Sequence, residues 1–134
     1  MSKRILIVDD DQLLLDLLTH LLSRIGYEVE QVLESGEALE RLTHRQFDAI
    51  FLDMKMPKMD GKEFYSKVQE QAPGLLKRII FVTGDVANPA TITFLKETGN
   101  FHLSKPFTIG EVRTLLHRFF QGTVPFSDPS NTPQ

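Results

Sequence analysis

The sequence lacks several features that whole classes of protein require. It has no cysteine among its 134 residues, which excludes disulfides, thiolate metal sites and cysteine nucleophiles. No apolar run is long enough to span a bilayer, and the N-terminal Met1–Arg4 leads straight into a short apolar segment rather than a signal peptide. We therefore expect a cytoplasmic protein that does not act at a membrane.

Basic clusters and glycine-rich phosphate loops are also absent. The net charge is −3 and lysines and arginines are scattered, which argues against direct nucleic-acid binding. The eight glycines form neither GxGxxG nor GxxxxGK[ST], so a nucleotide- or flavin-binding domain has little support. What remains is a globular composition, 41% apolar and 25% charged, in a chain long enough for one domain.

Five segments read as β-strands. Three are almost unbroken runs of β-branched, aromatic and other apolar residues, which is typical of parallel strands buried on both faces. Two are mixed or alternating, as edge strands are. The central strands are predicted at 5–8, 49–52 and 79–82, and the edge strands at 27–32 and 101–104.

Helical patterns separate these strands. Seven residues of the first helix form an apolar stripe at helical spacing: Leu13, Leu14, Leu17, Leu18, Leu21, Leu22 and Ile25. Four further helices are predicted from their starts: near Ser35, after Asp60, after Asn88, and after a capping box of Thr108 and Glu111.

Alternating strands and helices predict an α/β fold. With right-handed crossovers and the two mixed strands at the edges, the arrangement is a doubly wound, five-stranded parallel sheet in the order 2-1-3-4-5, as in flavodoxin-like folds. We expect one domain over residues 1–121. Residues 122–134 carry three prolines among small polar residues and are expected to form a flexible tail or linker remnant.

The polar residues gather where this fold binds ligands, at the carboxyl ends of the strands. Asp9 and Asp10 follow the first strand, Asp53 the third, Thr83 the fourth and Lys105 the fifth. Carboxylates about 4 Å apart repel by several kcal/mol, and an oxygen-only ligand set favours Mg²⁺. A carboxylate nucleophile beside a divalent ion, a lysine and a hydroxyl suits phosphoryl transfer onto aspartate.

Here the chain resembles the receiver domains of response regulators in two-component signalling, in the manner of chemotaxis regulators. The resemblance spans residues 3 to about 120. It rests on four motifs at successive strand ends: VDDD at 8–11, FLDMKMPKMDG at 51–61, FVTG at 81–84 and LSKPF at 103–107. Residues 78–85 and 97–99 look most like receivers attached to hybrid histidine kinases.

The resemblance implies a role for each acidic residue. Asp53 matches the phosphoacceptor, which also contacts the metal. Asp10 matches a direct Mg²⁺ ligand, and Asp9 a neighbour that acts through water or by orientation. The backbone carbonyl of Lys55 matches the third protein ligand.

The resemblance also implies contacts to the phosphoryl group and a switch. Lys105 and Thr83 match the groups that bind phosphoryl oxygens, and the backbones of Met54 and Gly84 are expected to contact the group. The Lys105–Pro106 bond matches one that is typically cis in the family.

The switch position departs from the family pattern. Thr83 is expected to act with the residue three before the lysine, which is usually Tyr or Phe and here is His102, next to Phe101. Either His102 has a modified switch role, which would make the output sensitive to pH, or signalling proceeds without an aromatic swing.

The expected function is therefore that of a phosphorelay receiver. A histidine kinase or a histidine phosphotransfer protein would donate the phosphoryl group, and a downstream protein would bind the fourth helix, fifth strand and fifth helix. The domain would catalyse only its own phosphorylation and dephosphorylation, and homodimerisation stays open. A phosphohydrolase of the haloacid dehalogenase type is set aside, because Lys55 and Pro57 stand where that family needs Asp and Thr. The alternative is a receiver-like interaction module that is never phosphorylated.

Overall fold

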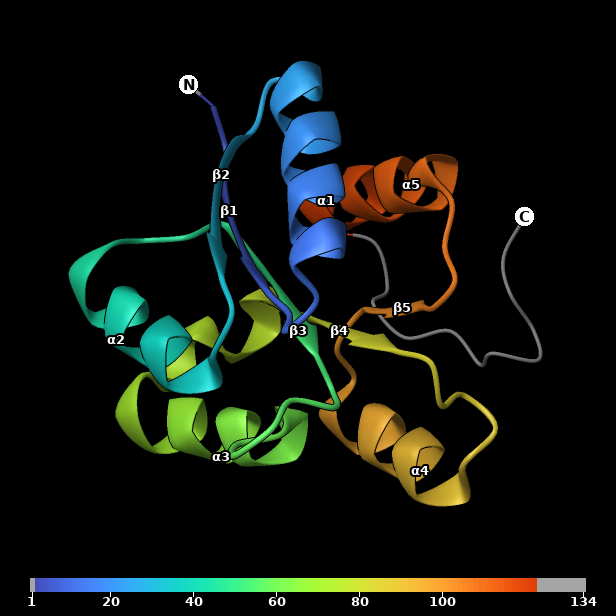
Figure 1. Cartoon of the computed structure of the whole chain (residues 1–134). Coiled ribbons are helices and arrows are strands. Elements are labelled where there is room, and N and C mark those ends of the chain that lie inside the picture. Colours follow the sequence, from blue (N-terminus) through green and yellow to red (C-terminus); the bar gives the residue numbers. More distant parts are fainter. Residues whose placement is uncertain (1, 123–134) are drawn as a thin grey trace.

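A computed structural model describes residues 2–122 of the chain. It shows one parallel sheet between two layers of helices (Figure 1). The strand order β2-β1-β3-β4-β5 confirms the predicted doubly wound topology. The expected tail lies outside the described residues, apart from Gly122. The strands are β1 (Arg4–Val8), β2 (Glu28–Val32), β3 (Ala49–Asp53), β4 (Ile79–Thr83) and β5 (His102–Ser104).

Five α-helices cover the two faces of the sheet. One core cluster joins the sheet to α2, α3 and α4, and the other joins it to α1 and α5 (Figure 1). A 3₁₀ segment before β4 was not predicted. None of the helices described has both the length and the apolar content needed to cross a bilayer. The helices are α1 (Gln12–Ile25), α2 (Ser35–His44), α3 (Gly61–Gln71), α4 (Pro89–Thr98) and α5 (Ile109–Phe120), and the 3₁₀ segment is η1 (Pro73–Arg78).

The unbroken apolar runs arise because the central strands serve both cores. In β3, Ile50 faces the α2–α4 layer and Phe51 faces the α1 and α5 layer, and both are buried. The edge strands differ as predicted: Val32 is the one fully buried residue of β2, and β5 pairs with β4 over three residues. Continuous burial is therefore confined to strands that have neighbours on both sides.

The predicted helix caps are present. Asp60 accepts a hydrogen bond from the amide of Glu63 at 2.9 Å, and Asn88 accepts one from the amide of Ala90 at 2.8 Å. Thr108 and Glu111 form the reciprocal capping box. These caps satisfy backbone amides that a helix leaves unpaired, and they fix where α3, α4 and α5 begin at the carboxyl edge of the sheet.

The apolar stripe of α1 is divided between core and solvent. Leu18 and Leu22 are buried together with Leu15, which the predicted stripe omitted. Leu13 is 82% exposed and Leu17 is 53% exposed. These two lie four residues apart and therefore on one side of the helix, where they form an exposed apolar surface.

Gly61 is the point where α3 approaches the end of β3 most closely. Its amide donates to the carbonyl of Met54 at 3.0 Å. A β-carbon at Gly61 would lie 2.7 Å from Sδ and 3.0 Å from Cα of Met54. Glycine is therefore required for the spacing between the two chain segments rather than for an unusual backbone angle.

We expect Gly61→Ala to lower the free energy of unfolding by about 1–3 kcal/mol, the usual cost of inserting a methyl group into a packed site. Urea denaturation measures the change. Gly36→Ala is the control, because a β-carbon there meets nothing within 4 Å. Equal stability of the two variants would contradict the steric explanation.

Candidate functional site

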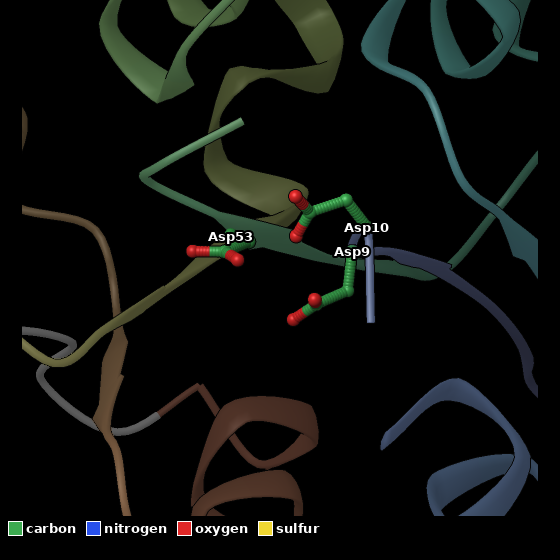
Figure 2. Close-up of side chains that lie close together, drawn as sticks. All are labelled: Asp9, Asp10 and Asp53. Atoms are coloured by element: carbon green, nitrogen blue, oxygen red, sulfur yellow. The ribbon is translucent and has the colours of Figure 1, made fainter. Parts of the chain in front are cut away.

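Three carboxylates meet at the carboxyl edge of the sheet. Asp9 and Asp10 follow β1, and Asp53 ends the neighbouring strand β3. One carboxylate oxygen of each lies within 4.8 Å of the others, and Figure 2 shows the side chains converging on one space. Asp9 is 3% exposed and Asp53 is 6% exposed, whereas Asp10 faces solvent. The cluster is therefore buried at Asp9 and Asp53 and open to solvent at Asp10.

Lys105 bridges the two buried carboxylates. Its Nζ lies 3.0 Å from Oδ2 of Asp9 and 3.2 Å from Oδ2 of Asp53. Burial raises the pKa of Asp9, although the Asp11 amide and the Lys105 ammonium act against that rise. Burial alone would lower the pKa of Lys105, but its hydrogen bond to Asp9 and the charge of Asp53 outweigh burial and raise that pKa. Each partner thus stabilises the charged form of the other.

The site keeps an excess of negative charge despite this lysine. Three carboxylates and one ammonium group leave two negative charges when all are ionised. The donor atoms within reach of one another are oxygens, which suit a hard divalent cation. The residues present therefore fit a divalent ion bound between β1 and β3.

Backbone groups next to Asp53 differ in their availability. The amide of Lys55 donates to Oδ1 of Asp53 at 3.0 Å. The amide of Met54 donates instead to the carbonyl of Val82 at 2.9 Å, so its proton is already used within the sheet. The phosphoryl contact from the Met54 backbone stays a prediction, and the Lys55 amide is the donor that lies beside the carboxylate in this structure.

The end of β4 borders the same site. Thr83 is buried, and its hydroxyl oxygen accepts a hydrogen bond from the Asp85 amide at 3.0 Å, which leaves the hydroxyl proton available for another acceptor. The Lys105 amide donates to the carbonyl of Thr83 at 2.8 Å. A β-carbon at Gly84 would lie 3.8 Å from Cβ of Lys105. The threonine, glycine and lysine are thus held next to one another. The Lys105–Pro106 bond is cis, as predicted.

His102 and Phe101 lie on opposite faces of the sheet. Phe101 packs edge-on against Phe119 of α5 with ring centroids 5.3 Å apart. His102 is half-buried, and it pairs in register with Phe81, whose side chain belongs to the α2–α4 core. Burial lowers the pKa of His102 below its ordinary value of 6.5. Phe101 therefore lies on the other face of the sheet from the position of the missing aromatic, and burial favours the neutral form of the imidazole.

The sequence matches a known family over most of its length. A family model described as the response regulator receiver domain matches residues 5–117. The chain belongs to this family. As a receiver domain it is similar to the transcriptional regulatory protein CrdR of Helicobacter pylori, with 29% identity over 90% of the chain and 56% of CrdR. It is also similar to the response regulator MprA of Mycobacterium sp. (strain KMS), with 30% identity over 98% of the chain and 56% of MprA.

Solved receiver structures share the fold along their whole length. The chemotaxis protein CheY4 of Vibrio cholerae has a TM-score of 0.79 and 31% identity, covering 89% of this chain and 99% of CheY4. A CheY-like receiver domain protein from Methanospirillum hungatei has a TM-score of 0.75 and 32% identity, covering 91% and 99%. By contrast, the receiver spans about half the length of the curated relatives CrdR and MprA.

Sequence reasoning placed the three aspartates and Lys105 together, and the structure confirms this placement. Two features of the structure were not predicted. Leu13 and Leu17 are exposed rather than part of a single stripe. Ser35 is 2% exposed and donates its hydroxyl proton to the carbonyl of Met59 at 2.8 Å, a contact across 24 residues that no local pattern indicates.

We expect Asp9→Asn to raise stability in the absence of divalent cations. Because burial raises the pKa of Asp9, its charge opposes folding at pH 7, and this penalty fades as the pH falls through the pKa of the folded protein. The gain should therefore be larger at pH 7 than at pH 4. Urea unfolding at both pH values measures it, and destabilisation at pH 7 would contradict the explanation.

Proposed function

We propose that this receiver domain accepts a phosphoryl group on Asp53 from the phosphohistidine of a histidine kinase or a histidine phosphotransfer protein. The observation that carries the proposal is the position of the Asp53 carboxylate, which lies within 4.8 Å of two further carboxylates and 3.2 Å from the Lys105 ammonium. A metal ion can bind between the carboxylates while the Lys105 ammonium group lies next to the same Asp53 carboxylate.

The residues of the site would have different roles in the transfer. Asp10, Asp53 and the carbonyl of Lys55 would hold Mg²⁺, with Asp9 acting through water or by orienting the others. Bound Mg²⁺ would neutralise charge on the transferred oxygens. An Asp53 oxygen attacks phosphorus as the bond from phosphorus to the donor histidine breaks, and the histidine leaves with the electron pair.

Once the phosphoryl group is on Asp53, the hydrogen bonds in the site would change. Lys105 is in place to pair with a phosphoryl oxygen instead of the free Asp53 carboxylate, and Thr83 can donate its hydroxyl proton. The backbone of Gly84 would add a contact to a phosphoryl oxygen. The domain would thus catalyse its own phosphorylation and, with water as the nucleophile, its own dephosphorylation. An interaction module that is never phosphorylated is less well supported, because it would not need this complete acidic set.

The output would pass through Thr83 and His102 to α4, β5 and α5. Both residues lie on the strands that border α4, and Lys105 follows β5 directly. We propose that a downstream protein, or a second copy of the domain, binds this face in the cytoplasm after phosphorylation.

Asp53 should be phosphorylated by a small phosphodonor. Incubation with Mg²⁺ and acetyl phosphate should add the mass of one phosphoryl group to the intact wild-type protein. Asp53→Asn and an EDTA-treated sample should gain none, because each lacks one part of the reaction. Modification of Asp53→Asn to the wild-type extent would overturn the assignment.

The exposed leucines of α1 offer a place for the donor to dock. Leu13 lies in the first turn of the helix that begins immediately after Asp9–Asp11, and Leu17 follows one turn later. An apolar surface at the rim of a polar site suits a protein partner. A donor held there would present its phosphohistidine beside Asp53.

We expect the double variant Leu13→Ala and Leu17→Ala to slow phosphoryl transfer from a phosphohistidine protein by about tenfold, the effect of losing roughly 1.4 kcal/mol of binding. Rapid-quench transfer assays measure this rate. Labelling by acetyl phosphate should stay unchanged, since that donor is too small to reach the leucines. Equal slowing with both donors would instead indicate damage to the site itself.

His102 should respond to phosphorylation if it has a switch role. The NMR signals of its imidazole ring should shift when Asp53 is phosphorylated, and the ring should titrate below pH 6.5 in the unphosphorylated protein because burial lowers its pKa. Signals that are identical in the two states would exclude His102 from the switch.

A further inference from the structure

The loop from Met54 to Asp60 leaves the phosphoacceptor and leads to α3. Its two ends are fixed: the Gly61 amide closes onto the carbonyl of Met54 at 3.0 Å, and Asp60 caps α3. In between, Met56 is buried, whereas the Lys55 side chain faces solvent. The conformation of this loop decides where the Lys55 carbonyl, the expected third metal ligand, points.

The middle of the loop contains a strained turn. Lys58 has φ 69°, the left-handed region that a residue with a β-carbon rarely adopts. The Met59 amide donates to the carbonyl of Pro57 at 2.8 Å across this residue, which is the hydrogen bond of a γ-turn. Such a conformation persists only when surrounding contacts hold it in place.

The start of α2 supplies those contacts. Ser35, the first residue of α2, is 2% exposed and donates its hydroxyl proton to the carbonyl of Met59 at 2.8 Å. The preceding Glu34 lies 3.7 Å from Nζ of Lys58, but both of these side chains are exposed, so that ion pair contributes little. The buried hydroxyl is therefore the stronger restraint on the turn.

We propose that Ser35 is a positioning residue for the cation site. Its hydrogen bond to Met59 fixes the turn at Lys58 and thereby sets the part of the loop that carries Lys55. Ser35 touches neither the phosphoacceptor nor the metal ligands, and its effect passes through the loop backbone. The proposal rests on the proposed function, because it assigns to Ser35 an influence on Mg²⁺ binding.

The test compares variants in two measurements. Without metal, hydrogen exchange of the Lys55, Met56 and Met59 amides reports how firmly the loop is held. With Mg²⁺, chemical-shift titration gives the dissociation constant. Ser35→Ala should speed exchange in the loop and weaken Mg²⁺ binding by about tenfold, at the lower end of the losses seen when outer contacts that position a metal ligand are removed. Ser35→Thr should restore both, because it keeps the hydroxyl.

Thr98→Ala is the matched control. Thr98 is also buried and donates its hydroxyl to a backbone carbonyl, that of Leu95 at 3.1 Å, but it lies at the end of α4. A purely structural role for Ser35 predicts that both alanine variants lose stability and that both keep wild-type Mg²⁺ affinity. Should Ser35→Ala fail to fold, Ser35→Cys gives the same comparison with a weaker donor of similar size.

The outcomes separate this proposal from the function on which it rests. If the wild type binds Mg²⁺ and Ser35→Ala binds it equally well, the role of Ser35 is overturned and the phosphoryl site stands. If Ser35→Thr is as weak as Ser35→Ala, side-chain volume rather than the hydrogen bond is responsible, and the role is again overturned. If the wild type itself takes no Mg²⁺, both proposals fall.

Discussion

The contact of one ammonium group with two buried carboxylates organises this domain. Lys105 reaches Asp9 and Asp53 from a loop 96 and 52 residues away in sequence, so the contact ties β5 to β1 and β3 across the edge of the sheet. Without it, the two carboxylates would face each other in a region shielded from water, where repulsion is strong. The lysine reduces the repulsion between the carboxylates but does not neutralise their charge, and the remaining negative charge suits a divalent cation.

Much of this site was predictable because it follows from topology. Asp9, Asp10 and Lys105 follow strands and Asp53 ends one, and parallel strands bring their carboxyl ends to one edge. The starts of α3, α4 and α5 were equally predictable, since a capping residue and the amides it accepts from are three residues apart or fewer. The features that could be predicted are those set by a few neighbouring residues or by the strand order.

The remaining features depend on tertiary contacts that no short pattern encodes. Leu13 has the same spacing as its buried neighbours, and only the orientation of α1 on the sheet decides that it faces solvent. The hydrogen bond from the Met54 amide to the carbonyl of Val82 depends on the pairing of β3 with β4, which no short pattern around Met54 encodes. Asn100 is a further case: it is buried and donates to the carbonyls of Leu76 and Ile79 at 2.7 and 2.8 Å, and so anchors the unpredicted 3₁₀ segment to the start of β5.

The two exposed leucines of α1 also bear on how long any complex can last. A pair of side chains offers only a small apolar contact, which is typical of weak, transient complexes, and differences in affinity lie mostly in the dissociation rate. A partner that engages this surface should therefore leave quickly. Short-lived binding fits the proposed function, in which one protein donates the phosphoryl group and another binds the phosphorylated domain.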